Sequence, residues 1–104
     1  MQINVKEEEN HTVVEMFGAL DAAASREARE VFTSLLEQGK KEFVIDLTGV
    51  DFIDSSGLGA LVGFFKKVRI GEGDVKLAGL RQPIMKIFEL THLDRVFTMI
   101  PSAA

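Results

Sequence analysis

Side chains that could carry or regulate chemistry are concentrated in one short stretch of the sequence, from Asp51 to Gly59. It holds two carboxylates, two adjacent serine hydroxyls and two glycines. A serine at the start of a helix suits a phosphate group, because unpaired backbone N–H groups and the helix dipole stabilise negative charge there. Phosphorylation would add about −1.5 to −2 charges beside the carboxylates at neutral pH. A phosphorylation site that alters a binding surface is therefore one hypothesis for this stretch, and the residue types do not choose between Ser55 and Ser56.

The same residues also have a purely structural interpretation. Asp54, Ser55 or Ser56 can each cap a helix by accepting a hydrogen bond from its first N–H groups. Gly57 and Gly59 each weaken a helix by roughly 1 kcal/mol relative to alanine. Small residues in a first turn let another backbone or a bulky anion approach closely. The stretch is thus either a cap and tight turn or a modification site, and residue chemistry alone leaves both open.

Patterns typical of enzymes and cofactor sites are weak in this sequence. The spacing of Gly57, Gly59 and Gly63 is one residue too long for the G-x-G-x-x-G dinucleotide fingerprint, and no G-x-x-x-x-G-K-[ST] phosphate loop occurs. No G-x-S-x-G nucleophile motif occurs, and His11 and His92 belong to no metal-ligand pattern. We therefore expect no catalytic residue, no metal ligand and no cofactor.

The elements on either side of the serines must position them. The apolar run Phe43–Leu47 is typical of a central strand that is covered on both faces. Apolar residues at helical spacing then predict a helix from about Leu58 to Arg69, with Phe64 beside the apolar stripe as a candidate for partial exposure. The serines would lie between the two, at the carboxyl end of a strand, where open α/β sheets bind their ligands.

The remaining elements predict an α/β fold. Strands near Ile3–Val5 and Thr12–Phe17 are joined by a polar connection that suits an antiparallel hairpin. Asp21 is a good N-cap for a helix from about Ala22 to Gln38. A strand at 75–79, a helix with Pro83 in its first position and a strand at 96–99 follow. The order β-β-α-β-α-β-α-β predicts an open, mostly parallel mixed sheet with helices packed on it.

Length and composition set further limits. The 104 residues suit one domain spanning 1–104, and a net charge of −4 argues against a nucleic-acid binder. The absence of cysteine fits a reducing compartment. The longest apolar run is far shorter than the roughly 18 residues of a membrane span, and the N-terminus lacks the pattern of a signal peptide. We therefore expect a cytoplasmic protein with no membrane or nucleic-acid partner.

Several of these segments together resemble a known family. The strand Phe43–Leu47 and the string Phe52-Ile53-Asp54-Ser55-Ser56-Gly57-Leu58-Gly59-Ala60-Leu61 resemble the signature of the STAS domain of anti-sigma factor antagonists. Gly18-Ala19-Leu20-Asp21 resembles that family's G-x-L-D element, and Pro83 to Phe97 resembles its third helix and final strand. The resemblance covers nearly the whole chain, in order.

The resemblance implies a non-enzymatic switch protein. Such proteins bind an anti-sigma factor that is itself a serine kinase, and thereby release the sigma factor. The kinase phosphorylates the serine directly after the aspartate, which corresponds to Ser55, and this ends the tight complex. A metal-dependent serine phosphatase restores it. Asp21 corresponds to an acid that helps partner binding, and the expected binding face comprises Asp21, Asp54, Ser55, Ser56, Gly57, Leu58 and Gly59.

An alternative keeps the fold and changes the role. Domains of this kind also serve as accessory subunits of transporters or as parts of other signalling complexes. The chain departs from the family pattern at His92, where glycine is frequent; histidine tolerates a left-handed backbone better than most residues. A helix that often follows the last strand is expected to be short or absent here.

Overall fold

The computed structural model describes residues 1–103 and has the element order expected from the sequence. Five strands and three α-helices alternate after an opening hairpin, and a single 3₁₀ turn precedes the last strand. The elements are β1 (Gln2–Glu7), β2 (Thr12–Leu20), α1 (Ala22–Glu37), β3 (Glu42–Ile53), α2 (Ser55–Ile70), β4 (Asp74–Ala78), α3 (Gln82–Leu90), the 3₁₀ turn (Leu93–Arg95) and β5 (Thr98–Ile100).

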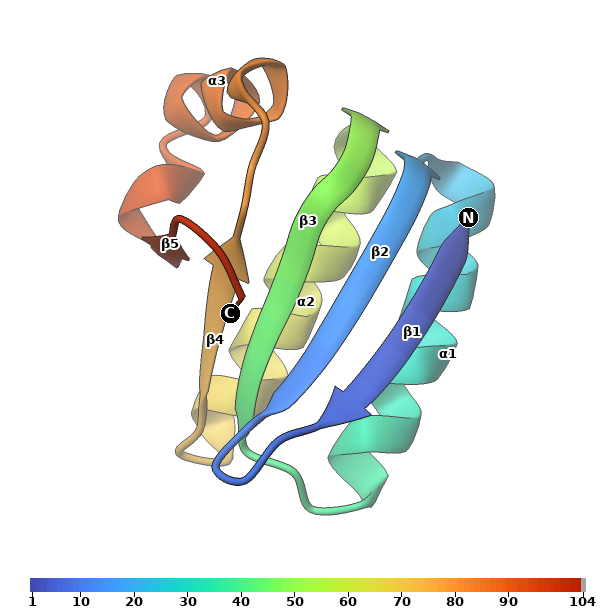
Figure 1. The fold of residues 1–104 in the computed structure, drawn as a ribbon, viewed down its shortest axis with the longest axis vertical. Helices are drawn as coiled ribbons and strands as arrows, with labels where there is room; N and C mark the ends of the chain where they lie inside the picture. Colours follow the sequence, from blue (N-terminus) through green and yellow to red (C-terminus); the bar gives the residue numbers. More distant parts are fainter. Residues whose placement is uncertain (104) are drawn as a thin grey trace.

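The strands form one sheet in the order β1-β2-β3-β4-β5 (Figure 1). β1 is antiparallel to β2, and every other neighbouring pair is parallel. This is the expected α/β mixed sheet. Each parallel connection carries a helix, as a crossover between parallel strands requires.

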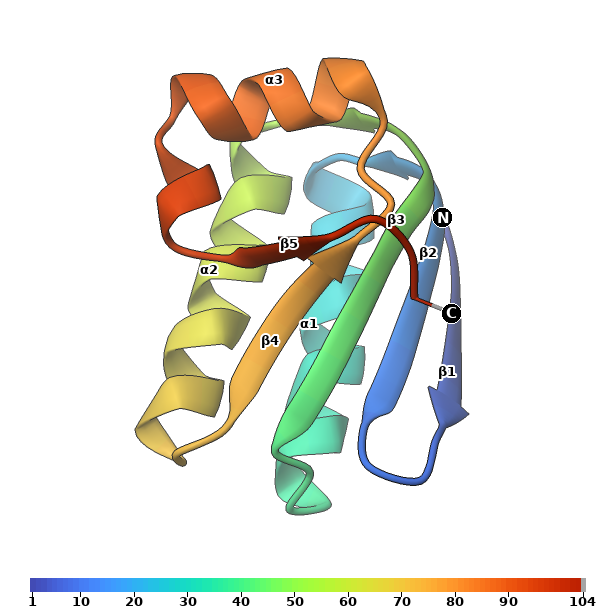
Figure 2. The same ribbon diagram turned by 60° about the vertical axis from the view of Figure 1, so that its left-hand side comes forward.

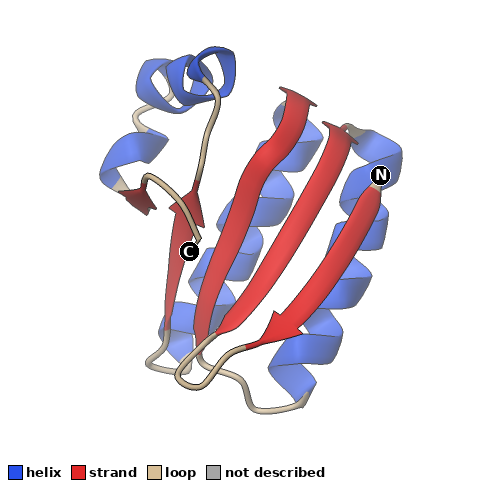
Figure 3. Ribbon diagram, viewed as in Figure 1, coloured by secondary structure: helices blue, strands red, loops and turns tan. Residues whose placement is uncertain are grey.

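The two long helices lie on one face of the sheet. α1 and α2 run behind the strands, whereas α3 lies across the end of the molecule at which β2 and β3 finish (Figures 2 and 3). The predicted covering of Phe43–Leu47 on both faces is confirmed, because all of its apolar side chains are buried and Asp46 is half-buried. On the open face, Val13, Val44 and Ala78 are buried by Ile100 and Ala103 of the C-terminal segment. Farther along β3, Thr48 and Phe52 are exposed.

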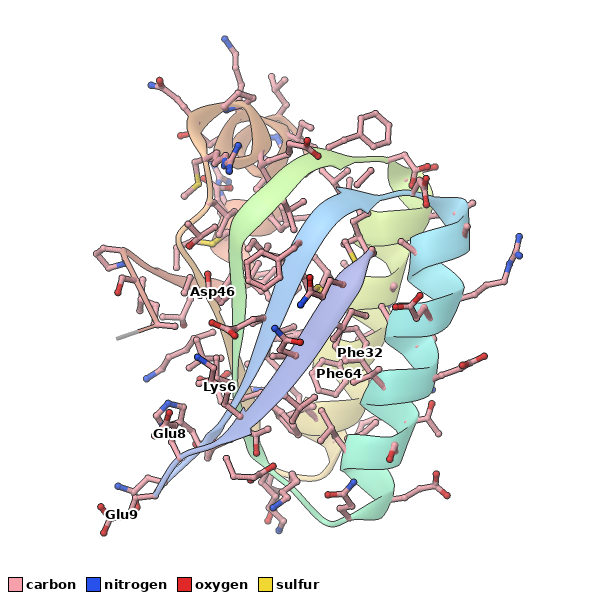
Figure 4. All side chains as sticks on the ribbon, turned by 45° about the vertical axis from the view of Figure 1, so that its right-hand side comes forward. Lys6, Glu8, Glu9, Phe32, Asp46 and Phe64 are labelled. Atoms are coloured by element: carbon pink, nitrogen blue, oxygen red, sulfur yellow. The ribbon has the colours of Figure 1, made fainter. Side chains whose placement is uncertain are left out.

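The main core fills the space between the sheet and the helices. Phe64 is 3% exposed and stacks on Phe32 with ring centroids 4.1 Å apart, while Phe43 meets the Phe64 ring edge-on at 4.8 Å. Figure 4 shows Phe32 and Phe64 side by side between the sheet and the helices, and Lys6 and Asp46 on the opposite face of the sheet. The proposed partial exposure of Phe64 is therefore wrong, because α1 packs against that side of α2.

Several boundaries differ from those expected. β2 continues to Leu20 and β3 to Ile53, while α2 begins at Ser55 instead of near Leu58. Pro83 follows Gln82 and is the second helical residue, and the last strand is Thr98–Ile100. His92 stands where the family often has glycine, and it adopts the left-handed conformation with φ 61°. The connection between β3 and α2 is consequently a single residue, Asp54.

Irregular pairing between β2 and β3 explains why β3 extends well beyond the predicted apolar run Phe43–Leu47. Glu15 pairs with Asp46 and Phe17 with Gly49, and then Gly18 pairs with Val50 and Ala19 with Phe52. Each of these steps leaves one extra residue on β3, which is a β-bulge. A bulge shifts the inward-facing residues by one position, so strict alternation fails along this strand.

The stacked phenylalanines give the first testable expectation. Phe64→Ala should lower the free energy of unfolding by about 3–5 kcal/mol, because it removes a buried ring that contacts two others. Urea unfolding followed by circular dichroism measures the change. The matched control is Ile70→Ala on the same helix, where the side chain is 84% exposed and the change should stay within about 0.5 kcal/mol. Similar values for the two variants would contradict this core assignment.

Candidate functional site

Two helix N-termini lie side by side at the carboxyl ends of β2 and β3. Leu20 pairs with Ile53, the last residue of each strand, and the backbone N–H of Asp54 donates to the carbonyl oxygen of Leu20 at 3.4 Å. A single residue separates each strand from the helix that follows: Asp21 between β2 and α1, and Asp54 between β3 and α2. Since adjacent strands are about 4.8 Å apart, the sheet fixes the spacing of the two helix starts.

The two aspartates at this end occupy equivalent positions. Asp21 is the N-cap of α1 and accepts a hydrogen bond from the N–H of Ala24 at 2.9 Å. Asp54 is the N-cap of α2 and accepts from the N–H of Gly57 at 3.0 Å. Both carboxylates are partly exposed. They complement the positive ends of the helix dipoles and satisfy N–H groups that a helix leaves unpaired.

Capping by Asp54 leaves both serine hydroxyls available. Ser55 is the first residue of α2 and is exposed, whereas Ser56 is partly buried. Among residues 1–103, no hydrogen bond engages the hydroxyl of either serine. The structure thus decides the capping question left open by the sequence in favour of Asp54. It also shows that Ser55 is the more accessible of the two hydroxyls.

The two glycines of the first turn have different surroundings. Gly57 is buried, and a Cβ added there would collide with the carbonyl oxygen of Leu20 and the side chain of Ile53. Gly59 is exposed, and the nearest atom to an added Cβ is a guanidinium nitrogen of Arg29 at 3.8 Å. Gly57 is therefore required for α2 to pack against the end of β2. Packing within the chain does not explain Gly59.

The other predicted residues lie around this centre. Leu58 is partly buried and packs against the main core. Asp51 is exposed and is the extra residue of the second bulge in β3. The structure thus brings the Asp21 and Asp54 caps to one end of the sheet with Ser55, Ser56 and Gly59. Gly57 and Leu58 lie underneath them.

The described residues offer neither a metal site nor a membrane span. Within residues 1–103, no group of three or more histidine, aspartate or glutamate side chains is placed to hold a metal ion. In the same range, no helix is both long and apolar enough to cross a bilayer.

The contrast between the glycines can be tested by paired substitutions. Gly57→Ala should destabilise the domain by roughly 1–3 kcal/mol, because the new methyl group has no room below the Leu20 carbonyl. Gly59→Ala should be neutral or stabilise it by up to about 1 kcal/mol, since alanine is the better helix former and the position is open. Thermal and urea unfolding of both variants measure the difference. Equal destabilisation would show that Gly59 is also needed for packing.

Similarity to known proteins agrees with this geometry. The family model described as STAS domain matches residues 2–104. The chain is 36% identical over 93 residues to the anti-sigma-B factor antagonist of Bacillus subtilis. The aligned region covers 89% of this chain and 84% of that relative.

Solved structures share the fold at lower identity. The phosphorylated form of the Bacillus protein SpoIIAA has a TM-score of 0.76 and 21% identity, covering 95% of this chain and 91% of that one. A sulfate transporter family protein from Wolinella succinogenes has a TM-score of 0.79 and 15% identity. The match covers 90% of this chain and 79% of that one. The fold alone therefore does not separate the two roles considered above. The 36% identity to an anti-sigma-B factor antagonist favours the antagonist role, and together with the family match over residues 2–104 it shows that the chain belongs to the STAS-domain family of anti-sigma factor antagonists.

Proposed function

We propose that this antagonist binds an anti-sigma factor that is also a serine kinase, and that phosphorylation of Ser55 by this kinase ends the complex. The observation that carries the proposal is the exposed hydroxyl of Ser55 at the first position of α2, next to a cap already made by Asp54. The Bacillus subtilis relative is an anti-sigma-B factor antagonist, which supports an anti-sigma factor as partner. The phosphorylated form of SpoIIAA supports phosphorylation as a property of similar proteins.

The proposed reaction needs ATP, which the kinase partner would bring. The Ser55 Oγ attacks the γ-phosphorus, the bond to the β-phosphate oxygen breaks, and ADP leaves. The hydroxyl proton passes to a base on the kinase. A serine phosphatase reverses the modification by hydrolysis. The antagonist is then the substrate of both enzymes, and catalyses neither reaction.

The position of Ser55 allows a large local change in charge without unfolding. A phosphate at the first position of a helix is stabilised by the helix dipole and the unpaired N–H groups, by about 0.3–1 kcal/mol per charge at an exposed site. The same phosphate adds about −1.5 to −2 charges beside the Asp54 and Asp21 caps. A partner surface matched to the neutral hydroxyl then meets a dianion. We infer that the interface is disrupted while the domain keeps its fold.

The kinase can be identified and used directly. The Ser55→Ala chain, immobilised as bait in extract of the source organism, should retain a protein that binds ATP and a sigma factor. That protein, once purified, should transfer phosphate from ATP to the wild-type chain, and fragmentation mass spectrometry should locate the phosphate on Ser55. Phosphate found only on Ser56, or a retained protein without kinase activity, would contradict the assignment. Capture of transporter subunits would favour the accessory role.

Substitution of the two serines separates modification from binding. Ser55→Ala should abolish phosphorylation and leave the dissociation constant nearly unchanged, because the small neutral side chain keeps the surface uncharged. Ser55→Asp should weaken binding by about tenfold or more, since it places a charge where the partner expects none. Ser56→Ala is the matched control and should be phosphorylated normally. Calorimetry with the purified kinase and a phosphate-incorporation assay measure both quantities.

A further inference from the structure

Two large aromatic side chains are exposed on the open face of the sheet, at the end that carries Ser55. Phe52 is 50% exposed and Phe17 is 41% exposed. Scattered apolar residues are normal on protein surfaces, but neighbouring ones within a polar rim mark interaction sites. These two phenylalanines therefore need an explanation that isolated exposed residues such as Ile70 do not.

The strand pairing places them on the same face. Ala19 pairs with Phe52 and Phe17 pairs with Gly49, so the two phenylalanines are diagonal neighbours on adjacent strands. Diagonal neighbours are about 7–8 Å apart, within reach of aromatic side chains. The bulge at Asp51 turns Val50 and Ile53 into the core, both less than 5% exposed, and leaves Phe52 facing outward.

Packing within the described chain does not account for Phe52. The main core and the partly buried side chains that contact it include Val50 and Ile53 but not Phe52. Phe17 differs, because its ring lies where a side chain at Gly49 would stand and so covers that glycine. Exposed polar residues lie nearby on β3 and beside it: Asp51 precedes Phe52, and the Nε of Arg81 donates to the carbonyl oxygen of Thr48 at 2.8 Å.

The closeness of Phe52 to Ser55 identifies the occupant. Three residues of extended chain span at most about 11 Å. A standard protein interface buries about 800 Å² on each partner, which corresponds to a disc of roughly 16 Å radius. A partner that covers Ser55 with a surface of this size therefore also reaches Phe52. Phenylalanine is among the residues that are enriched at protein interfaces relative to the rest of the surface.

We propose that Phe52 is an anchor for the anti-sigma factor kinase and inserts into an apolar pocket beside its active site. This inference rests on the proposed function and extends the binding face around the edge of the sheet, beyond the loop and α2. Phe52 carries no charge and contributes affinity, whereas Ser55 carries the switch. Because the anchor is engaged equally before and during phosphate transfer, it supplies uniform binding.

Truncation of the ring tests the anchor. Phe52→Ala should raise the dissociation constant for the purified kinase by about tenfold or more, as expected for an interface hot spot. In the phosphorylation assay it should raise KM and leave kcat unchanged, the signature of lost uniform binding. Phe52→Leu, which keeps an apolar side chain, should recover most of the affinity. Phe17→Ala is a poorer test because it also uncovers Gly49.

Ile70→Ala is the control, because it removes a more exposed apolar side chain at the far end of α2. It should leave the dissociation constant and KM within about twofold of the wild-type values. Unfolding midpoints of all variants show whether each is folded at the assay temperature. If the wild type binds and is phosphorylated on Ser55 while Phe52→Ala behaves like Ile70→Ala, the anchor is refuted and the proposed function stands. If the wild type neither binds nor is phosphorylated, the proposed function fails and the anchor with it.

Discussion

The parallel pairing of β2 with β3 is the constraint on which the functional end of the molecule depends. It sets Leu20 opposite Ile53, so the strands end together and the two helices start together. The close contact between α2 and the Leu20 carbonyl leaves no room for a side chain at position 57. Asp21 and Asp54 then cap neighbouring helices in the same way. The carboxylate oxygen of each accepts a hydrogen bond from a backbone N–H, with oxygen–nitrogen distances of 2.9 and 3.0 Å. The site is thus two helix N-termini held in register by a sheet.

This arrangement also suits a modification that changes charge without changing the fold. Negative charge at a helix start is tolerated, because the dipole and unpaired N–H groups favour it. The cap made by Asp54 does not involve the Ser55 hydroxyl, so modifying Ser55 breaks no side-chain hydrogen bond among residues 1–103. A phosphate there would alter the surface by almost two charges while the core beneath, closed by Phe32 and Phe64, keeps its packing.

The sequence was sufficient for the order of the elements and for the placement of Asp54–Gly59 at a strand-to-helix turn. The helical spacing of apolar residues predicts α2, and Asp21 is predicted to cap α1. The structure contains both, and it places the D-S-S-G string at the start of α2. The errors arose where distant contacts decide. Bulges at β3 are set by its pairing with β2, so alternation could not show that β3 runs to Ile53 or that Phe52 faces outward. Phe64 is buried by α1, which its own helix cannot reveal.

Residues that the fold requires can be separated from those it does not, and this distinction bears on partner choice. Gly57, Leu58 and Ile53 are fixed by packing, so any protein with this strand-to-helix turn needs similar residues there whatever it binds. Ser55, Gly59 and Phe52 are exposed, so contacts of the folded core do not restrict their side chains in the same way. Selectivity for one partner should therefore reside in exposed residues of this kind, at the end of the sheet where β2 and β3 finish.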